Sequence, residues 1–395
     1  MVATSITRSA EIPDRLRIER CRSLPNLGPR LLFFSGGSAL NGISRALKSY
    51  TFNSAHLITP FDSGGSSQVL RQAFDMPAVG DLRSRLMALA DETTLGQPDI
   101  YRLFHHRLPA DVPPAELAEE FASLLQGAHP YIRAIAQPMR GLILSNLRAF
   151  ARNKPGDFDL AHASIGNLII AGGYMLNDHA LEPVLFLMSK MVEVRGTVRA
   201  VVDANLHVGA DLSDGRRVIG QRQLTGKEEP PIDSPIARLF LSDGTRELPP
   251  GDVRLPKRNR KLIEQADLIC YPPGSLYTSV IANLLPAGAG NAVALREVPK
   301  VYVPSLGHDP ECPGMRLTDQ VDALLSALRR DAGNDCPAER LITMVLTDAA
   351  ALDAGAAVEI AERHGVPCIP VDLCAPDAAD VYDPERLCDA LVSLS

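Results

Sequence analysis

The chain reads LLFFSGGSALNGISRAL over residues 31–47, and this stretch predicts a strand, a glycine turn and a helix in immediate succession. Residues 31–34 form a short apolar run that is typical of a buried strand. Ser35, Gly36, Gly37 and Ser38 follow, and apolar residues then recur at the spacing of an amphipathic helix. This order is the first half of a βαβ unit.

The same order of strand, small-residue loop and helix recurs along the chain. A strand is predicted at 55–58 and another at 267–271, and each is followed by a loop rich in glycine and serine. Later strands are predicted at 301–303, 342–346 and 367–371, interleaved with helices at 318–329, 353–363 and 385–393. Short strands that alternate with helices predict an α/β fold with a doubly wound, mostly parallel sheet covered on both faces.

Two other patterns divide the chain. From about 93 to 190 the spacing is helical, with the best helices at 115–125, 132–150 and 163–176. The period then changes to two, and strands are predicted at 198–202, 206–212, 216–223 and 236–241. We therefore expect an N-terminal arm over 1–30, an α/β domain over 31–395 with a helical and β insertion at about 93–250, and a C-terminal extension at about 331–395.

Composition and charge exclude several functions. The 47 acidic and 40 basic side chains give a net charge of −7, which does not support a nucleic-acid-binding surface. No apolar run approaches the ~20 residues that cross a bilayer, and the N-terminus lacks an apolar secretory core. We expect a cytoplasmic protein without a membrane or nucleic-acid partner. The seven cysteines contain no C-x-x-C pair, so neither a disulfide framework nor a zinc ribbon is predicted.

Three loops of glycine and serine follow three predicted strands, at 35–38, 62–67 and 272–275. In an open parallel sheet, ligands bind at the carboxyl ends of the strands. Glycine lets backbone N–H groups approach a bound group, and the next helix N-terminus adds partial positive charge. Together the loops predict a phosphate-bearing ligand, although any one of them could equally be a tight turn without a ligand.

Charged residues in and near these loops have two interpretations each. Asp62 is a candidate for a Mg²⁺ contact or a ligand hydroxyl, or else an aspartate that closes its own turn. Arg83 either clamps a phosphate or forms a surface ion pair. Asp81, after Gly80, is a plausible helix N-cap and a further candidate for the ligand site.

Two uncharged residues complete the candidates. Asn167 lies in an apolar helix, where an unpaired amide is costly, so it bonds either backbone or ligand. Tyr277 either packs in the first helical turn or places its ring against a base or sugar.

Several named motifs are absent. The glycine spacing of 37–44 is that of a P-loop, but Ile43 occupies the place of the phosphate-binding lysine, and G-x-G-x-x-G and G-x-S-x-G do not occur. The histidines show neither H-x-x-x-H nor H-E-x-x-H spacing, and the adjacent His105 and His106 point to different sides of a helix. A histidine metal site is therefore not expected.

Five motifs in order resemble one superfamily, that of 2-phospho-L-lactate transferase (CofD-like proteins) and the bacterial gluconeogenesis factor. They are SGGSALNGISRALK at 35–48, TPFDSGGSSQVLRQ at 59–72, VGDLRSRLMALAD at 79–91, IGNLIIAG at 165–172 and ADLICYPPGSLYTSVIANLLP at 266–286. The resemblance extends from about 31 to 330. The last motif is more similar to the gluconeogenesis-factor branch.

The resemblance implies a Rossmann-like fold and a homodimer. The transferase branch moves a phospholactyl group from a guanylylated donor to a deazaflavin, with Mg²⁺ and release of GMP. The regulator branch binds a UDP-sugar and influences carbon metabolism and cell shape. Some CofD-like proteins are encoded with an ATP-grasp protein and an HPr-kinase-like protein, which implies partners from a kinase system.

Carried onto this chain, the resemblance assigns residues of the three loops to a nucleotide pocket, with Asn167 nearby. These residues are Gly36, Gly37, Ser38, Asp62, Gly64, Gly65, Ser66, Ser67, Pro273, Gly274, Ser275, Tyr277 and Thr278. The chain departs from the family pattern at Ala39, where a glycine is usual, and at Ser63, where a second aspartate is common. It also has Gln320 where a histidine is usual.

Two functions follow from these residues, and a third does not depend on them. In a transferase, Asp62 would hold Mg²⁺, while the loop N–H groups and Arg83 would stabilise charge on the phosphate. In a ligand-sensing regulator, the same pocket would bind a UDP-sugar without turnover, and the missing second loop aspartate favours this alternative. The third is a structural partner in a kinase-containing system.

Overall fold

The computed structural model describes residues 9–93, 96–226, 229–375 and 378–395. Seven parallel strands form the central sheet in the order β10-β9-β8-β7-β1-β2-β3. The strands are β1 (Leu31–Ser35), β2 (Ala55–Ile58), β3 (Thr197–Ala200), β7 (Leu268–Tyr271), β8 (Lys300–Tyr302), β9 (Met344–Asp348) and β10 (Cys368–Val371). The chain adds β2 and β3 on one side of β1 and then β7 to β10 on the other. This is the Rossmann-type order, and it confirms the predicted α/β fold.

The apolar run that opens the fold is buried on both faces of the sheet. Leu32 and Phe34 pack in one cluster with residues of α12, α13 and α14, while Leu31 and Phe33 pack with residues of α2 and α16. All four side chains are fully buried. A continuous apolar strand is what a parallel sheet covered on both faces requires.

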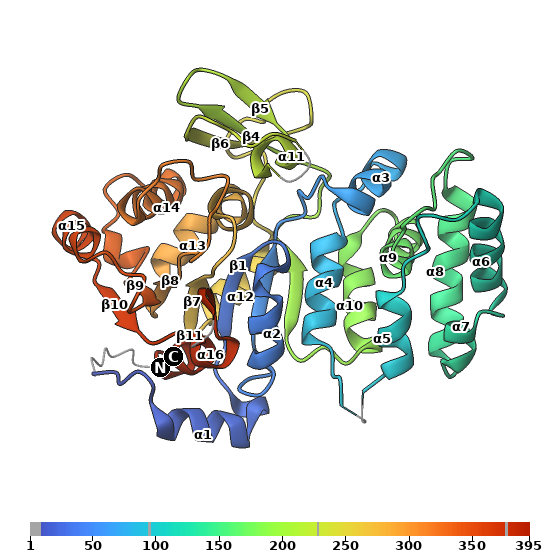
Figure 1. Ribbon diagram of the computed structural model, residues 1–395, viewed down its shortest axis with the longest axis horizontal. Helices are drawn as coiled ribbons and strands as arrows, with labels where there is room; N and C mark the ends of the chain where they lie inside the picture. Colours follow the sequence, from blue (N-terminus) through green and yellow to red (C-terminus); the bar gives the residue numbers. More distant parts are fainter. Residues whose placement is uncertain (1–8, 94–95, 227–228, 376–377) are drawn as a thin grey trace.

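Helices cover both faces of the sheet and form the part of the chain between β2 and β3 (Figure 1). They are α1 (Arg15–Ser23), α2 (Asn41–Leu47), α3 (Gly65–Phe74), α4 (Gly80–Leu89), α5 (Pro98–His105), α6 (Pro114–Gln126), α7 (Pro130–Ala134), α8 (Met139–Asn153), α9 (Ile165–Leu176), α10 (Leu181–Met191), α11 (Gln221–Thr225), α12 (Lys257–Gln265), α13 (Ala289–Leu295), α14 (Leu317–Ala332), α15 (Ala354–His364) and α16 (Pro384–Ser393). Figure 1 shows α5 to α9 on the opposite side of the molecule from α14 and α15.

Two sequence predictions were wrong in detail within this helical part and the β section. The helix predicted over 132–150 is two helices, α7 and α8, because Pro138 offers no N–H and cannot continue a preceding helix. The strand predicted over 216–223 ends at β5 (Arg217–Ile219), and α11 follows. Gly220 separates them with φ +116°, a backbone conformation that neither element contains.

The β section is a small antiparallel sheet in the order β5-β4-β6, with β4 at His207–Leu212 and β6 at Ile236–Ser242. It stands at the top of the view in Figure 1. A turn at 213–215 joins β4 to β5, with Gly215 N donating to Leu212 O at 3.0 Å. The strand predicted at 198–202 is not in this section: it is β3, the edge of the central sheet.

Both ends of the described chain pack on the α/β core. In the segment predicted as an arm, α1 contacts α16, and Asp14 N donates to Ser393 Oγ at 2.8 Å. In the C-terminal segment, β9 and β10 extend the central sheet, and α16 packs on α2. A two-stranded antiparallel pair, β11 (Cys374–Ala375) and β12 (Ala378–Tyr382), precedes α16.

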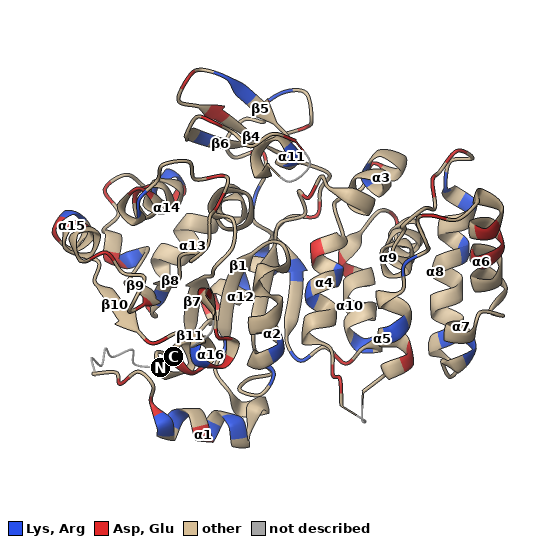
Figure 2. Ribbon diagram, viewed as in Figure 1, with Lys and Arg blue, Asp and Glu red and all other residues tan. Residues whose placement is uncertain are grey.

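Among the described residues, no helix has the length and apolar character needed to cross a bilayer. Figure 2 shows basic and acidic residues on all parts of the ribbon, with both signs in the helical part and in the β section. The charges are thus mixed in this view, as the modest net charge of −7 predicts.

Candidate functional site

The three glycine loops meet at the carboxyl ends of the sheet strands, because β7, β1 and β2 are neighbours and run parallel. Gly36 lies against the third loop: a Cβ there would stand 2.6 Å from Ser279 Oγ. Gly80, at the start of α4, lies against the second loop, where a Cβ would stand 2.5 Å from Ser67 Oγ and 3.4 Å from Asp62 Oδ2. Glycine is therefore required at both positions for the segments to approach this closely.

A buried arginine holds the first loop from behind. Arg85, from α4, is fully buried and donates to Ser44 Oγ, to Gly36 O at 3.2 Å and to Gly37 O at 3.1 Å. Burial lowers the pKa of Arg85 to about 10, so the side chain remains charged at neutral pH. The sequence analysis missed this residue. The sequence feature that could have indicated Arg85 is an arginine placed among the buried apolar residues of α4.

A second buried arginine holds the second loop in the same way. Arg71, from α3, donates to Phe61 O at 3.2 Å, to Asp62 O at 3.1 Å and to Leu206 O at 2.7 Å. It also donates to Asn205 Oδ1, and burial lowers its pKa. The sequence analysis quoted Arg71 within a family motif but assigned it no role.

The two arginines fix the direction of the loop amides. In a trans peptide unit the N–H points away from the C=O. Because the carbonyl oxygens of residues 36, 37, 61 and 62 face the arginines, the N–H groups of residues 37, 38, 62 and 63 face the opposite way. In each loop, two backbone carbonyl oxygens accept hydrogen bonds from a buried arginine. The N–H groups of the same peptide units point away from that arginine.

The two aspartates of the site differ in their local roles. Asp62 Oδ1 accepts a hydrogen bond from Gly64 N at 3.0 Å, so the turn-closing interpretation is correct for one carboxylate oxygen. Asp81 is not the predicted N-cap, because Val79 caps α4 and Asp81 lies in its first turn. Its carboxylate oxygens lie 3.8 and 3.9 Å from the Cβ position of Gly37, beside the first loop.

Three candidate residues form a chain of hydrogen bonds across the site. Asn167 Nδ2 donates to Ser66 Oγ at 3.0 Å, and Asn167 Oδ1 accepts from Arg83 Nε at 2.8 Å. The partners of Asn167 are thus side chains. Arg83 also donates to Phe104 O at 3.2 Å, and burial lowers its pKa to about 10, so the surface ion pair considered for it was wrong. Gly166 permits the contact, since a Cβ there would stand 2.6 Å from Arg83 Cδ.

The third loop differs, because carboxylates of the segment after β8 bind its amides. Leu276 N donates to Asp309 Oδ2 at 2.8 Å, while Tyr277 N and Thr278 N donate to Glu311 Oε2 at 3.1 and 2.8 Å. Thr278 Oγ1 donates to Glu311 Oε1. The amides that were expected to bind an anionic ligand therefore bind two carboxyl groups of the chain itself.

Glu311 is fully buried, and burial together with the nearby Asp309 raises its pKa to about 7. Glu311 and Asp309 were not predicted as site residues from the sequence. The Tyr277 side chain is buried, and its hydroxyl donates to Ile236 O at 3.3 Å. This contact favours the packing interpretation of Tyr277.

A cavity of about 440 Å³ lies between the third loop and the start of α2. The segment after β8 and the strand β12 supply its other walls. Pro273, Gly274 and Ser275 line it, opposite Ala39, Gly42 and Ile43. The C-terminal segment therefore forms part of the candidate site, which the sequence analysis did not foresee.

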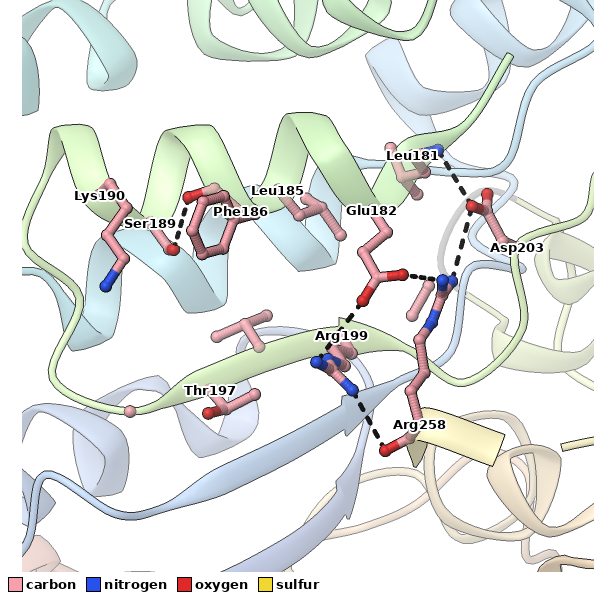
Figure 3. Close-up of a pocket in the computed structure, with 13 residues that line it drawn as sticks. Leu181, Glu182, Leu185, Phe186, Ser189, Lys190, Thr197, Arg199, Asp203 and Arg258 are labelled. Atoms are coloured by element: carbon pink, nitrogen blue, oxygen red, sulfur yellow. Dashed lines mark hydrogen bonds and ion pairs between the residues drawn. The ribbon is translucent and has the colours of Figure 1, made fainter. Parts of the chain in front are cut away.

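A separate pocket of about 240 Å³ lies at the β3 edge, between α10 and α12 (Figure 3). Glu182 pairs with both Arg199 and Arg258, and Asp203 accepts from Leu181 N at 3.0 Å. Its Glu182 is paired with two arginines of the same pocket, and none of the predicted site residues lines it. The candidate site is therefore at the loops and not in this pocket.

The sequence model described as 2-phospho-L-lactate transferase CofD matches residues 31–375, which includes every loop of the site. The chain belongs to the CofD family. The match extends through β9 and β10 in the C-terminal segment.

Relatives of this CofD-family chain bear the name of the other branch. It is 29% identical to a gluconeogenesis factor of Bacillus subtilis over 75% of this chain and 74% of that protein. It is 27% identical to a gluconeogenesis factor of Halalkalibacterium halodurans over 75% of this chain and 72% of that protein. A putative gluconeogenesis factor of Nostoc is 29% identical, but the aligned part spans 52% of its length.

A solved structure is similar over nearly the whole chain. The crystal structure of a UPF0052-family protein from Bacillus halodurans superimposes with a TM-score of 0.65 and 22% identity, covering 92% of this chain and 99% of that one. At this identity the similarity shows the fold, and the α/β architecture of the CofD-family chain is thereby confirmed.

Proposed function

We propose that this CofD-family chain binds a nucleotide-linked phosphate ligand at the loops after β1 and β2, and that it is a phosphoester transferase similar to 2-phospho-L-lactate transferase. One observation carries the proposal: Arg85 and Arg71 engage the carbonyl side of both loops and direct their N–H groups the opposite way. Backbone amides that point outward from loops held by buried cations are suited to phosphate oxygens.

In the proposed reaction, an acceptor hydroxyl oxygen attacks the phosphorus of a diphosphate-type donor. The new P–O bond forms as the bond to the nucleoside monophosphate breaks, and that group leaves with the electron pair. The acceptor proton passes to solvent or to a carboxylate. The loop N–H groups and the Arg83 guanidinium would stabilise the charge on the phosphate oxygens.

Magnesium fits the carboxylates of the site. Asp62 Oδ1 closes its turn, while Oδ2 lies near the start of α4, and Asp81 on that helix lies beside the first loop. Carboxylate oxygens are the ligands that Mg²⁺ prefers. Asp62 would hold the ion, which when bound would neutralise charge on the phosphates.

A regulator that binds a UDP-sugar without turnover is the second candidate function. The observation that favours it is the third loop, where Asp309 and Glu311 already bind the amides of the helical turn. A smaller set of free amides suits binding better than transfer. Two relatives, from Bacillus subtilis and Halalkalibacterium halodurans, bear the name gluconeogenesis factor, the branch from which this alternative is taken. A homodimer and partners from a kinase system are further proposals from the family resemblance, which light scattering and co-purification would test.

Calorimetric titration of the purified chain with GDP and with UDP-N-acetylglucosamine, each with and without Mg²⁺, tests the two functions. Binding of GDP that needs Mg²⁺ supports the transferase, and Mg²⁺-independent binding of the UDP-sugar supports the regulator. No binding of either contradicts both.

The variant Asp62→Asn tests the metal role of Asp62. We expect it to lose Mg²⁺-dependent binding with almost no change in melting temperature, because asparagine still accepts from Gly64 N. Asp214→Asn is a matched control, since Asp214 Oδ1 closes a similar turn onto Arg216 N at 2.9 Å in the β section. Unchanged binding by a folded Asp62→Asn protein would exclude Asp62 from the site. Loss of the fold would instead assign it the turn-closing role alone.

A further inference from the structure

Two histidines and a glutamate come together in the helical part, away from the candidate site. His106 follows α5, Glu120 lies in α6 and His129 caps the N-terminus of α7. His106 Nε2 lies 2.7 Å from Glu120 Oε1, and His129 Nε2 lies 3.8 Å from the same oxygen. One donor atom from each side chain lies within 4.8 Å of the others. The sequence analysis did not expect a histidine metal site, because the packing of three helices brings these residues together.

We propose that His106, Glu120 and His129 form a site for a divalent transition-metal ion, with Zn²⁺ as the ion that fits best. Two imidazole nitrogens and one carboxylate oxygen are a donor set that zinc takes in proteins. Zinc bonds of about 2.0–2.1 Å in tetrahedral geometry place neighbouring donors about 3.3 Å apart. The measured separations of 2.7 and 3.8 Å bracket that value, so each would change by about 0.5 Å.

The cluster is accessible from solvent. The side chains of the three residues are 20%, 25% and 14% exposed in chain order, so an ion can enter and a water can complete its coordination.

One existing contact would have to change. His129 Nδ1 accepts a hydrogen bond from Tyr131 N at 3.3 Å, which places the ring proton on Nε2. Coordination through Nε2 moves that proton to Nδ1 and releases the amide. The lost bond is long and exposed, so water replaces it at little cost. The Tyr131 ring meets both imidazoles edge-on at 5.1 Å, and this packing holds the two rings in place.

Metal titration of the whole chain tests the proposal. After removal of metals with EDTA, and with a phosphine reductant present, we expect calorimetry to show one Zn²⁺ bound per chain. Co²⁺ should give the visible absorption of a four- or five-coordinate nitrogen and oxygen site. A strong sulfur-to-cobalt band in the near ultraviolet would assign the metal to cysteines, and absence of Zn²⁺ binding would equally overturn the proposal.

Two substitutions locate the site. Glu120→Gln removes the charged ligand, and His129→Asn removes an imidazole while retaining an N-cap acceptor. Each should weaken Zn²⁺ binding at least tenfold. His105→Asn is the control, because His105 is adjacent in sequence but its ring contacts Tyr101 instead. Wild-type affinity in both site variants would contradict the assignment.

A measurement on the unmodified chain does not depend on how the variants fold. Diethyl pyrocarbonate modifies exposed imidazoles, and mass spectrometry can map the modified histidines. Zn²⁺ should protect His106 and His129 while His105 remains reactive. Equal modification of the three with and without Zn²⁺ would overturn the proposal. None of these readouts involves nucleotide binding, so the result is independent of the proposed function.

Discussion

The loops after β1 and β2 and the loop after β7 have similar sequences at the same edge of the sheet, but their surroundings have opposite charge. Buried guanidinium groups of Arg85 and Arg71 bond the carbonyls of the first two loops. Carboxylates of Asp309 and Glu311 bond the amides of the third. A glycine-serine loop at a helix N-terminus is therefore not in itself a free anion site. Whether its amides remain available to a ligand depends on whether neighbouring side chains bond the carbonyl oxygens of the loop or the amides themselves.

The largest effect should come from removing the cation behind the first loop. Arg85→Leu leaves the acceptors of Ser44, Gly36 and Gly37 buried without their donor, at a cost on the order of 3 kcal/mol or more of unfolding free energy. Denaturant unfolding measures the loss, and ligand affinity should fall with it. Arg148→Leu is the control, because Arg148 is exposed and makes one hydrogen bond, to Leu125 O. Equal stability of the two variants would mean that Arg85 does not support the loop.

The next effect concerns the carboxylate in front of the third loop. The folded state raises the pKa of Glu311 from 4.5 to about 7, so the folded chain holds this proton more tightly than the unfolded chain. The resulting stabilisation is fully present below pH 4.5 and is lost as pH rises through about 7.

The variant Glu311→Gln should not lose this stabilisation as pH rises, because glutamine does not titrate. Glutamine can accept from Tyr277 N and Thr278 N through its oxygen and can donate to Thr278 Oγ1, as the protonated acid would. Unfolding free energy measured from pH 4 to 8 should fall less in the variant, by on the order of 3 kcal/mol. Parallel pH profiles of the two proteins would refute the assignment of this proton to Glu311.

A smaller effect should follow from breaking the chain of hydrogen bonds that joins α9 to the second loop. Asn167→Leu leaves Ser66 Oγ and Arg83 Nε without their partner, at a cost of about 1–2 kcal/mol. Asn167→Asp retains an acceptor for Arg83 and should recover most of the stability. If the two variants melt alike, the bond to Arg83 contributes little, and the comparison between the loops would rest on Arg85 and Arg71 alone.

The sequence predicted the parts of the site that depend on local order. The strand, glycine loop and helix at 31–47 form from neighbouring residues, and parallel neighbours in the sheet then bring the three loops together. It did not predict that Arg85 would reach Gly36, or that Glu311 would reach Thr278, because each pair is separated by more than thirty residues. Those contacts depend on how helices pack, which local patterns do not encode.

The errors in the fold have the same origin at shorter range. Gly220 ended a strand whose alternation continues beyond it, and Pro138 divided a helix whose apolar spacing is unbroken. In both places a single backbone constraint outweighed the side-chain pattern on which the prediction relied.

The neighbouring central strands β1 and β7 are joined by a very long connection. Arg30 and Asp267, which precede them and pair with each other, are 237 residues apart in sequence. The entropy lost on closing a flexible loop grows with the logarithm of its length, so doubling the connection costs only about 0.6 kcal/mol. Helices α6 to α8 within it supply none of the hydrogen bonds to the loops described above, so they can lengthen or shorten at little thermodynamic cost to those loops. A fold built in this way lets the loop-bearing end of the sheet remain constant while that part of the intervening chain diverges.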